Sequence, residues 1–310
     1  MSTYHPPCRL IGFFAPADNF DKNKFHTAYY RITKKFHNLE YLIPRNIFKR
    51  YGTFAGTDTE KLEDINYLIK KKVNMIIGIK GGYGSARLLG RLDYKAIKNN
   101  RIFFMGYSDL TSILIAVNQM TGNIAYYGFL AIADFSDKLY NRQIEIFNEV
   151  INNRMPEYSL SCRVFKRTEG VESFSGISIA GCLSIICSLV GTRYFNQYKK
   201  PNILFLEDIN EEPYRIERML MHLKNAGVFK KTKCLFLDFN KCNSSKKNRN
   251  TISLKKSIND IFYEYDFPVI EFKHFGHRKN KILIPIGSEC KASLQISKNA
   301  NHGLAQLKWE

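Results

Sequence analysis

The sequence predicts an α/β fold whose first domain is built on a parallel sheet. Short apolar runs at 75–79 and 101–105 are typical of strands that are covered on both faces. Segments with apolar residues at helical spacing alternate with these runs, which favours parallel strands with helices layered on them. A length of 310 residues with 45% hydrophobic content is enough to bury two ordinary cores.

The first domain is expected to begin with a strand at 8–16, followed by a helix over 25–36 and a second strand that starts at Tyr41. The next helix, at 59–72, comes after three residues that suit a helix N-terminus, Thr57, Asp58 and Thr59. After the strand at 75–79 the chain reads Gly81-Gly82-Tyr83-Gly84 and then a helical segment at 85–89. The strand at 101–105 leads through Gly106-Tyr107-Ser108-Asp109 into a helix that stops at Gly122.

The alternation is lost in the polar stretch 134–170, which contains Asn152, Asn153 and Pro156. Residues 146–170 are therefore predicted to be a linker between a domain at 1–145 and a domain at 171–310. In the second domain we expect strands near 177–181, 202–206, 234–239 and 268–272, with helices at 211–226 and 253–265. Pro213 suits the first turn of the helix at 211–226, and Gly227 suits its end.

Composition limits the classes of function. The net charge of +19 would suit a nucleic-acid binder, but Lys and Arg are spread along the whole chain without a nucleic-acid-binding motif. A lysine-rich compositional bias is the simpler cause, although such a field attracts anionic small molecules. The 7 Cys show neither C-x-x-C pairs nor zinc-ligand spacing with His, so no metal site is expected.

No apolar run approaches the roughly 18–20 residues that span a membrane. The N-terminus, Met1-Ser-Thr-Tyr-His-Pro-Pro, lacks the basic-then-apolar form of a secretory signal. We therefore expect a cytoplasmic protein that binds neither membrane nor nucleic acid.

Ser108 stands between a predicted strand and a predicted helix, which is where a nucleophile elbow places its serine. The following helix N-terminus would direct unpaired backbone N–H groups toward an anion that forms there. Two features weaken the motif. Ser is also a favoured helix N-cap, and Leu110 replaces the last glycine of G-x-S-x-G. Both interpretations of Ser108, as a nucleophile and as a cap, stay open on the local sequence.

Two further candidates follow predicted strands: Glu207 and His277. A serine nucleophile needs a base for its proton and an acidic group that orients the base, and the order Ser, Glu, His meets this requirement. Taken singly, each has a simpler explanation: an acidic residue after a buried strand is commonly solvated, and a His in a glycine-bounded loop is commonly structural.

The glycine loop Gly81-Gly82-Tyr83-Gly84 does not fit the usual phosphate-binding loops. It lacks the Lys-Ser/Thr of a P-loop, and Arg87 replaces the third glycine of the dinucleotide-binding pattern. Glycine at this place would instead let the backbone approach a reacting centre and present an N–H group to an oxyanion.

Five segments occur in one order: 81–89 (GGYGSARLL), 106–111 (GYSDLT), 204–208 (LFLED), 213–216 (PYRI), and Gly276-His277 with Pro285-Ile286-Gly287. Together they resemble the LD-carboxypeptidase family of serine peptidases, which includes the microcin C immunity proteins. The resemblance runs from about residue 10 to 295. It implies a flavodoxin-like N-terminal domain that carries the serine, and a swivelling-type, β-rich C-terminal domain that carries Glu and His. It also implies a cleft between them as the active site, and a homodimer.

By this resemblance Ser108 is the nucleophile, His277 the general base and then acid, and Glu207 the residue that orients it. The backbone N–H groups of Gly82 and Asp109 would form the oxyanion hole. Lys80, Tyr83 and Arg87 are the candidate substrate contacts. The competing side chains are His274, which lacks the preceding glycine, and the acidic residues Glu211, Glu212 and Glu217, which belong to the helix at 211–226.

Two positions depart from the family pattern. Lys80 stands where Arg usually precedes the glycines, and Tyr127-Gly128-Phe129 replaces the usual His-Gly-Pro. Neither removes a member of the triad, but both lie where substrate contacts are expected.

The resemblance implies a serine carboxypeptidase that needs no cofactor and removes the terminal D-alanine from murein tetrapeptide during cell-wall recycling. One alternative is an immunity-type hydrolase of peptidyl or aminoacyl adenylates. Those relatives stack the base on an aromatic side chain, and the only Trp here is Trp309, near the C-terminus. Another alternative is a non-catalytic module that binds an anionic ligand.

Overall fold

The structure is a computed structural model and describes residues 7–137, 140–166, 173–196, 199–242, 252–297 and 302–310. Its internal contacts divide the chain into two units. Unit 1 comprises residues 1–156 together with 279–284, and unit 2 comprises 157–278 together with 285–310. The chain therefore leaves unit 2 once, just after His277 and Arg278, and returns to it at Pro285.

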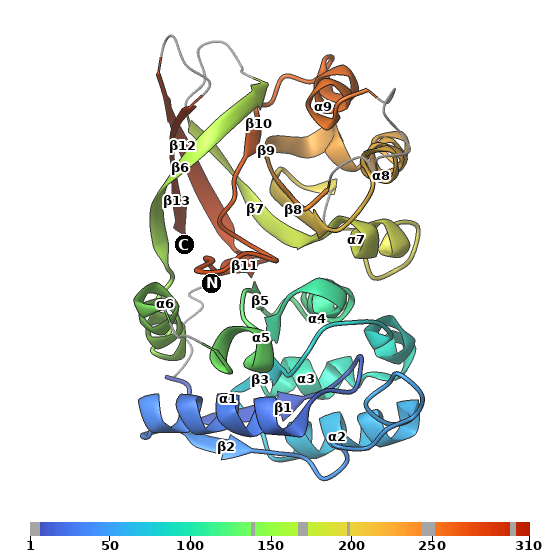
Figure 1. Cartoon of the computed structure of the whole chain (residues 1–310), viewed down its shortest axis with the longest axis vertical. Helices are drawn as coiled ribbons and strands as arrows, with labels where there is room; N and C mark the ends of the chain where they lie inside the picture. Colours follow the sequence, from blue (N-terminus) through green and yellow to red (C-terminus); the bar gives the residue numbers. More distant parts are fainter. Residues whose placement is uncertain (1–6, 138–139, 167–172, 197–198, 243–251, 298–301) are drawn as a thin grey trace. The chain divides into compact units, whose positions relative to one another are not determined.

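A six-stranded sheet has the order β11-β5-β4-β3-β1-β2, and all of it lies in unit 1 except the last two residues of β11 (Figure 1). Its strands are β1 (Leu10–Phe14), β2 (Glu40–Leu42), β3 (Met75–Gly78), β4 (Phe103–Gly106), β5 (Ala125–Tyr127) and β11 (Ile284–Ile286). Strands β1 to β5 pair in parallel. Because β3 and β4 are neighbours, the loops that follow their carboxyl ends meet at one edge of the sheet. These loops carry Gly81 and Ser108.

Helices cover this sheet. They are α1 (Lys22–Lys35), α2 (Asp58–Lys70), α3 (Tyr94–Asn99), α4 (Thr111–Thr121), α5 (Ala131–Phe135) and α6 (Asn141–Ile151). Helix α1 packs against α5, and α3 packs against α4. Thr57 begins α2 with a reciprocal capping box to Glu60, as the sequence predicted for this position. Gly122, at φ +77°, ends α4 in a left-handed conformation that glycine adopts without strain.

Unit 2 is a closed barrel in the order β10-β6-β13-β12-β7-β8-β9. Its strands are β6 (Glu157–Lys166), β7 (Ser173–Cys182), β8 (Asn202–Ile209), β9 (Thr232–Asn240), β10 (Val269–Glu271), β12 (Glu289–Ile296) and β13 (His302–Trp309). β7, β8, β9 and β10 pair in parallel, and the remaining pairs are antiparallel. The predicted α/β fold, with a parallel sheet in the first part and a β-rich second part, is confirmed.

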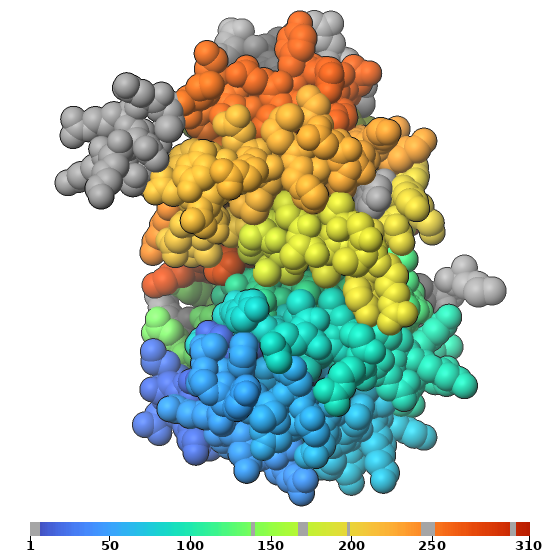
Figure 2. All heavy atoms as spheres, turned by 90° about the vertical axis from the view of Figure 1, so that its right-hand side faces the viewer, coloured from blue at the N-terminus to red at the C-terminus, as the bar shows by residue number. Residues whose placement is uncertain are grey.

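The parallel strands of the barrel are connected through helices α7 (Leu183–Leu189), α8 (Pro213–Asn225) and α9 (Leu254–Phe262). α8 packs against both α7 and α9. The three helices form the outer surface of unit 2 that Figure 2 shows in yellow to orange. Strand β8 is buried over Asn202–Asp208, so the side chains near its carboxyl end are shielded from solvent.

The region predicted as a linker contains regular structure. Residues up to Ile151 belong to α6, and β6 begins at Glu157; residues 167–170 lie outside the described part. The polar composition hid two patterns. Ile146, Phe147, Val150 and Ile151 form the buried stripe of α6, and Leu160, Cys162 and Val164 alternate as the buried face of β6.

Two smaller predictions also change. The segment predicted as a helix at 85–89 is a 3-10 helix, η1 (Ser85–Arg91), in which Gly90 disfavours an α-helix. Strand β8 continues to Ile209, so Glu207 lies within it and not beyond its end. In the part of the chain that the structure describes, no helix is both long enough and apolar enough to cross a membrane.

Candidate active site

Ser108 occupies a sharp turn between a buried strand and a helix. β4 ends at Gly106, a single 3-10 turn, η2 (Ser108–Leu110), follows, and α4 begins at Thr111. Ser108 has φ +61°, a left-handed conformation that costs a non-glycine residue energy. The elbow geometry predicted from the sequence is therefore present. Such strain is typical of positions that are held for function.

The alternative interpretation of Ser108, as a helix cap, is wrong. The cap of η2 is Tyr107 and the cap of α4 is Leu110, and neither makes a side-chain capping bond. The local contacts of Ser108 include two hydrogen bonds of its backbone. The Ser108 carbonyl oxygen accepts a hydrogen bond of 2.6 Å from the Thr111 hydroxyl, and the Ser108 N–H donates to the Tyr127 hydroxyl at 3.4 Å.

The glycine loop after β3 lies directly beside this turn. A Cβ atom added to Gly81 would sit 2.9 Å from the Ser108 Cβ and 3.0 Å from its Oγ, and 3.8 Å from the Asp109 nitrogen. Glycine is therefore required at 81 because the Ser108 side chain occupies the space. The loop and the backbone N–H of Asp109 are close enough to face one reacting group.

Asp109 connects the start of η1 to the Ser108 turn through hydrogen bonds. Its buried carboxylate accepts a hydrogen bond of 2.8 Å from the Ser85 N–H, and its carbonyl oxygen accepts one of 2.6 Å from the Ser85 hydroxyl. Burial raises the pKa of the Asp109 carboxyl, and the hydrogen bonds from Ser85 act in the opposite direction. The Asp109 side chain is therefore structural, while its backbone stays part of the turn.

Asp18, from the loop after β1, contacts the glycine loop and the lysine that precedes it. Its Oδ1 accepts a hydrogen bond of 3.2 Å from the Tyr83 N–H. Gly82, at φ +116°, lies so close that an added Cβ would be 2.3 Å from the Asp18 carboxyl carbon. The Lys80 ammonium pairs with Asp18 at 3.6 Å and donates to the Asn19 carbonyl at 2.9 Å. Lys80 thus helps to hold the loop.

The two other candidate substrate contacts differ in exposure and partners. Tyr83 is 64% exposed, and its ring lies 5.7 Å from that of Phe54. The Arg87 guanidinium makes a two-pronged ion pair with Asp58, through contacts of 2.9 and 2.7 Å, and this hydrogen bonding holds the pKa of Asp58 below its usual range. Arg87 is therefore engaged by a carboxylate of the protein itself.

Glu207 and His277 form a hydrogen-bonded pair within unit 2. The His277 Nδ1 lies 2.8 Å from the Glu207 Oε2, and the His277 backbone N–H donates to the same oxygen at 3.3 Å. The side chain of Glu207 is 1% exposed and that of His277 is 17% exposed. The contact suits the tautomer in which Nδ1 carries the hydrogen and donates it to the carboxylate, and in that tautomer Nε2 has the free lone pair.

The loop around His277 is fixed at several points on β8 and β9. Gly276 has φ +64°, and an added Cβ would lie 2.3 Å from the Glu207 carboxyl carbon. The Asn240 side-chain amide donates to the His277 carbonyl at 2.8 Å. Arg278 makes a two-pronged contact with the buried Asp238, with its Nε at 2.6 Å. These contacts set the direction of the imidazole before any substrate binds.

The rival side chains have other partners. The His274 Nε2 lies 2.9 Å from the Ser161 carbonyl oxygen of β6. Glu211 pairs with Arg215 at 3.6 Å, and the Glu217 carboxylate accepts a hydrogen bond of 2.9 Å from Ser257. Glu212 is the N-terminal cap residue of α8. Among these candidates Glu207 and His277 are the pair that the structure brings together.

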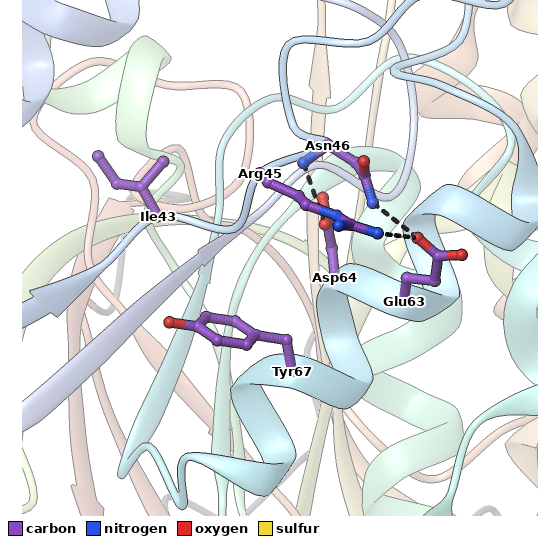
Figure 3. Close-up of a pocket in the computed structure, with 6 residues that line it drawn as sticks. All are labelled: Ile43, Arg45, Asn46, Glu63, Asp64 and Tyr67. Atoms are coloured by element: carbon purple, nitrogen blue, oxygen red, sulfur yellow. Dashed lines mark hydrogen bonds and ion pairs between the residues drawn. The ribbon is translucent and has the colours of Figure 1, made fainter.

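A pocket of about 480 Å³ in unit 1 is lined by none of the predicted site residues. Figure 3 shows the side chains that line it: Ile43, Arg45, Asn46, Glu63, Asp64 and Tyr67. Asn46 joins the two acidic residues, because its backbone N–H donates to Asp64 at 3.1 Å and its side-chain amide donates to Glu63 at 3.1 Å. Burial raises the pKa of Asp64 to about 6.

Sequence reasoning missed the residues that position the site. Asp18 and Asp238 are acidic residues near the carboxyl ends of strands β1 and β9, a placement that would have marked them as candidates. Nothing in the sequence shows that they pair with Lys80 and Arg278. Within the described residues, no group of three or more His, Cys, Asp or Glu side chains is arranged to hold a metal ion.

The comparisons with known proteins agree with this arrangement of motifs. Residues 11–128 match the LD-carboxypeptidase N-terminal domain, and residues 175–292 match the LD-carboxypeptidase C-terminal domain. The chain is 28% identical to a probable murein peptide carboxypeptidase of Bacillus subtilis over 283 residues, which cover 90% of this chain and 87% of that protein. It is 25% identical to the microcin C7 self-immunity protein MccF of Escherichia coli over 312 residues, which cover 89% of this chain and 88% of that protein.

Solved structures give the same result. The crystal structure of muramoyltetrapeptide carboxypeptidase from Oxalobacter formigenes matches with a TM-score of 0.82 at 25% identity, and the match covers 96% of this chain and 98% of the other. A structure of MccF in complex with aspartyl sulfamoyl adenosine also has a TM-score of 0.82, at 20% identity, and covers 98% of each chain, which supports the fold alone. The two domain matches, in order along the chain, show that this protein belongs to the LD-carboxypeptidase family.

Proposed function

We propose that this protein is a serine carboxypeptidase that removes the terminal D-alanine from murein tetrapeptide. The observation that carries the proposal is the 2.8 Å hydrogen bond between His277 Nδ1 and the buried Glu207, which leaves Nε2 as the base. The strained Ser108 beside Gly81 supplies the matching nucleophile in unit 1. The similarity to named murein peptide carboxypeptidases indicates the substrate class.

In the proposed reaction the Ser108 Oγ attacks the carbonyl carbon of the amide between the L-centre and D-alanine. His277 Nε2 takes the hydroxyl proton and gives it to the D-alanine nitrogen as the C–N bond breaks. The peptide stays on Ser108 as an ester. His277 then takes a proton from a water molecule, whose oxygen attacks the ester carbon. The bond between that carbon and the Ser108 Oγ breaks, His277 gives the proton to the Oγ, and the shortened peptide leaves with a new carboxyl group.

In the proposed mechanism two backbone N–H groups stabilise the negative charge that forms on the substrate oxygen, and Glu207 stabilises the positive charge on the imidazole. The negative oxygen of each tetrahedral intermediate accepts hydrogen bonds from the backbone N–H groups of Gly82 and Asp109. Glu207 keeps the imidazole in the required tautomer and stabilises its protonated form. Tyr83, exposed on the glycine loop, is the candidate for a side-chain contact with the substrate.

The alternative activity, hydrolysis of an aminoacyl or peptidyl adenylate, has less support. Trp309 is the only Trp in the sequence and is buried in the barrel, where its ring nitrogen donates to the Ser178 hydroxyl at 2.9 Å. The Trp309 ring is therefore not exposed for stacking on a nucleotide base. A cytoplasmic location and a homodimer stay predictions.

The test is to incubate the protein with murein tetrapeptide and to quantify free D-alanine. We expect Ser108→Ala and His277→Ala to lower kcat by at least about 10³-fold, and Glu207→Gln by about 10²–10⁴-fold. His274→Ala is the matched control and should keep wild-type kcat. Cleavage of an aminoacyl adenylate but not of the tetrapeptide would favour the immunity-type reaction, and binding without turnover of either would favour a non-catalytic role.

A further inference from the structure

Lys281 is a buried cation outside the proposed triad. It belongs to the segment 279–284, which the contacts assign to unit 1. Its side chain is 2% exposed, and its ammonium lies 3.0 Å from the Asp134 Oδ1 and 3.5 Å from the centre of the Tyr107 ring. A buried ammonium is stable only where charges and hydrogen-bond acceptors compensate for the loss of water.

Asp134 is held rigidly for this contact. Its side chain is 4% exposed. One carboxylate oxygen accepts a hydrogen bond of 2.8 Å from the Leu130 N–H, and the other accepts one of 3.3 Å from the Gln143 side chain. Lys281 therefore contacts a fixed partner within unit 1, and loss of either member would remove a close counter-charge from a buried group.

Tyr107 links Lys281 to the elbow, because it directly precedes Ser108. The Tyr107 ring lies 6.4 Å from the ring of Tyr127, edge to face, and the Tyr127 hydroxyl accepts the Ser108 N–H at 3.4 Å. The ammonium over the Tyr107 ring thus acts on the same group of side chains that supports the backbone of Ser108. Cation–π contacts of this kind are strongest where water is excluded.

Leu283 anchors the same segment within unit 1. A Cβ added to Gly128, just after β5, would lie 2.9 Å from the Leu283 side chain. Lys281 and Leu283 therefore hold the segment 279–284 against the elements that flank the Ser108 turn.

We propose that Lys281 is a positioning residue: by its ion pair with Asp134 and its contact with the Tyr107 ring, it holds the turn that carries Ser108 in place within unit 1. The inference rests on the proposed serine mechanism. Lys281 acts through Tyr107 and not on a reacting atom. Without it Ser108 persists, but its turn is held less firmly, and a misplacement of the nucleophile by about 1 Å can cost about 10²-fold in rate.

The test compares Lys281→Met, Asp134→Asn, the double variant and Lys279→Met, an exposed lysine of the same segment that serves as control. At a temperature where circular dichroism shows each variant folded, we expect Lys281→Met to lower kcat for D-alanine release about 10–100-fold, with KM within about threefold. The double variant removes both charges of the ion pair, so it should be more stable to heat than either single variant, but its kcat should stay as low as that of Lys281→Met. Recovery of both in the double variant, or a wild-type kcat in Lys281→Met, overturns the proposal.

A second measurement does not depend on the tetrapeptide. A fluorophosphonate probe reacts with an activated serine: the Oγ–P bond forms, fluoride leaves, and the base takes the hydroxyl proton. Mass spectrometry should locate the label on Ser108, and its rate should fall in Lys281→Met by about the same factor as kcat. If the wild type labels Ser108 but leaves the tetrapeptide intact, only the substrate assignment fails and the labelling rates still decide the role of Lys281. If Ser108 is not labelled at all, the serine mechanism and this inference fall together.

Discussion

Replacing Ser108 by glycine should give a more stable protein than replacing it by alanine, although both changes remove the proposed nucleophile. The φ angle of Ser108 is +61°, which an L-residue adopts at a cost of roughly 1–2 kcal/mol. Glycine adopts it without strain but loses about 0.5–1 kcal/mol through its greater freedom in the unfolded chain. At the midpoints of these ranges the difference predicts that Ser108→Gly is about 0.75 kcal/mol more stable than Ser108→Ala, which keeps the strain.

The comparison between two inactive variants isolates the backbone term, because both lack the hydroxyl group. Lys72 provides a matched control. It is exposed, lies just after α2 and has φ +54°, and it belongs to no part of the site. Lys72→Gly should gain a similar amount over Lys72→Ala and should leave kcat unchanged.

Urea midpoints followed by far-UV circular dichroism are the appropriate assay, since midpoints at constant slope compare variants without extrapolation. Tryptophan fluorescence would report on unfolding of unit 2 alone, because the single Trp, Trp309, lies in unit 2 and Ser108 lies in unit 1. If Ser108→Gly is no more stable than Ser108→Ala while the Lys72 pair shows the expected gain, the backbone at Ser108 is not strained and the argument from its φ angle is refuted.

Three further outcomes can be measured on single variants. Gly81→Ala places a methyl group 3.0 Å from the Ser108 Oγ and should lower kcat about 10–100-fold with a small loss of stability; an unchanged kcat in the tetrapeptide assay would contradict the close contact. Gly276→Ala pushes a methyl group into the Glu207 carboxylate and adds strain at φ +64°, so we expect a loss of about 2–4 kcal/mol in urea unfolding; a loss below about 1 kcal/mol would argue against it. Burial raises the pKa of Asp64 from 3.8 to about 6, so the folded state binds this proton more tightly than the unfolded state does. The free energy of unfolding therefore falls as the pH rises from about 4 to about 6, by at most about 3 kcal/mol. Asp64→Asn should therefore be more stable than the wild type at pH 8 and equal to it near pH 4, and equal melting temperatures at both pH values would show that the Asp64 carboxylate is solvated.

The elements that carry the predicted site residues could be predicted because their sequence signals are local. β3 and β4 are continuous apolar runs, and the Ser108 turn is bounded by Gly106 and a helical stripe. The barrel strands β12 and β13 left no such signal. They alternate polar and apolar side chains, and their pairing is long-range: Ser293 of β12 lies opposite Ser173 of β7, 120 residues earlier.

The partners of charged side chains were not predictable from the sequence. Lys80 and Arg87 are candidate substrate contacts by resemblance, and the structure also pairs them with Asp18 and Asp58, which the sequence did not predict. Which carboxylate a lysine or arginine meets depends on the packing of loops from different strands, and no local pattern encodes that. The same holds for Lys281, whose sequence neighbours give no sign that it is buried.

Gly81 and Gly276 meet the same steric requirement in the two units. Gly81 is needed because the Ser108 side chain fills the space where its Cβ would lie, and Gly276 is needed because the Glu207 carboxylate does the same. Each glycine lets the backbone of one loop touch a proposed catalytic side chain from another part of the chain. The motifs are therefore steric requirements of the site, and a glycine at these positions is evidence for the contact even before the partner is known. A serine or alanine at either position in another member of the family would require that the partner side chain be displaced.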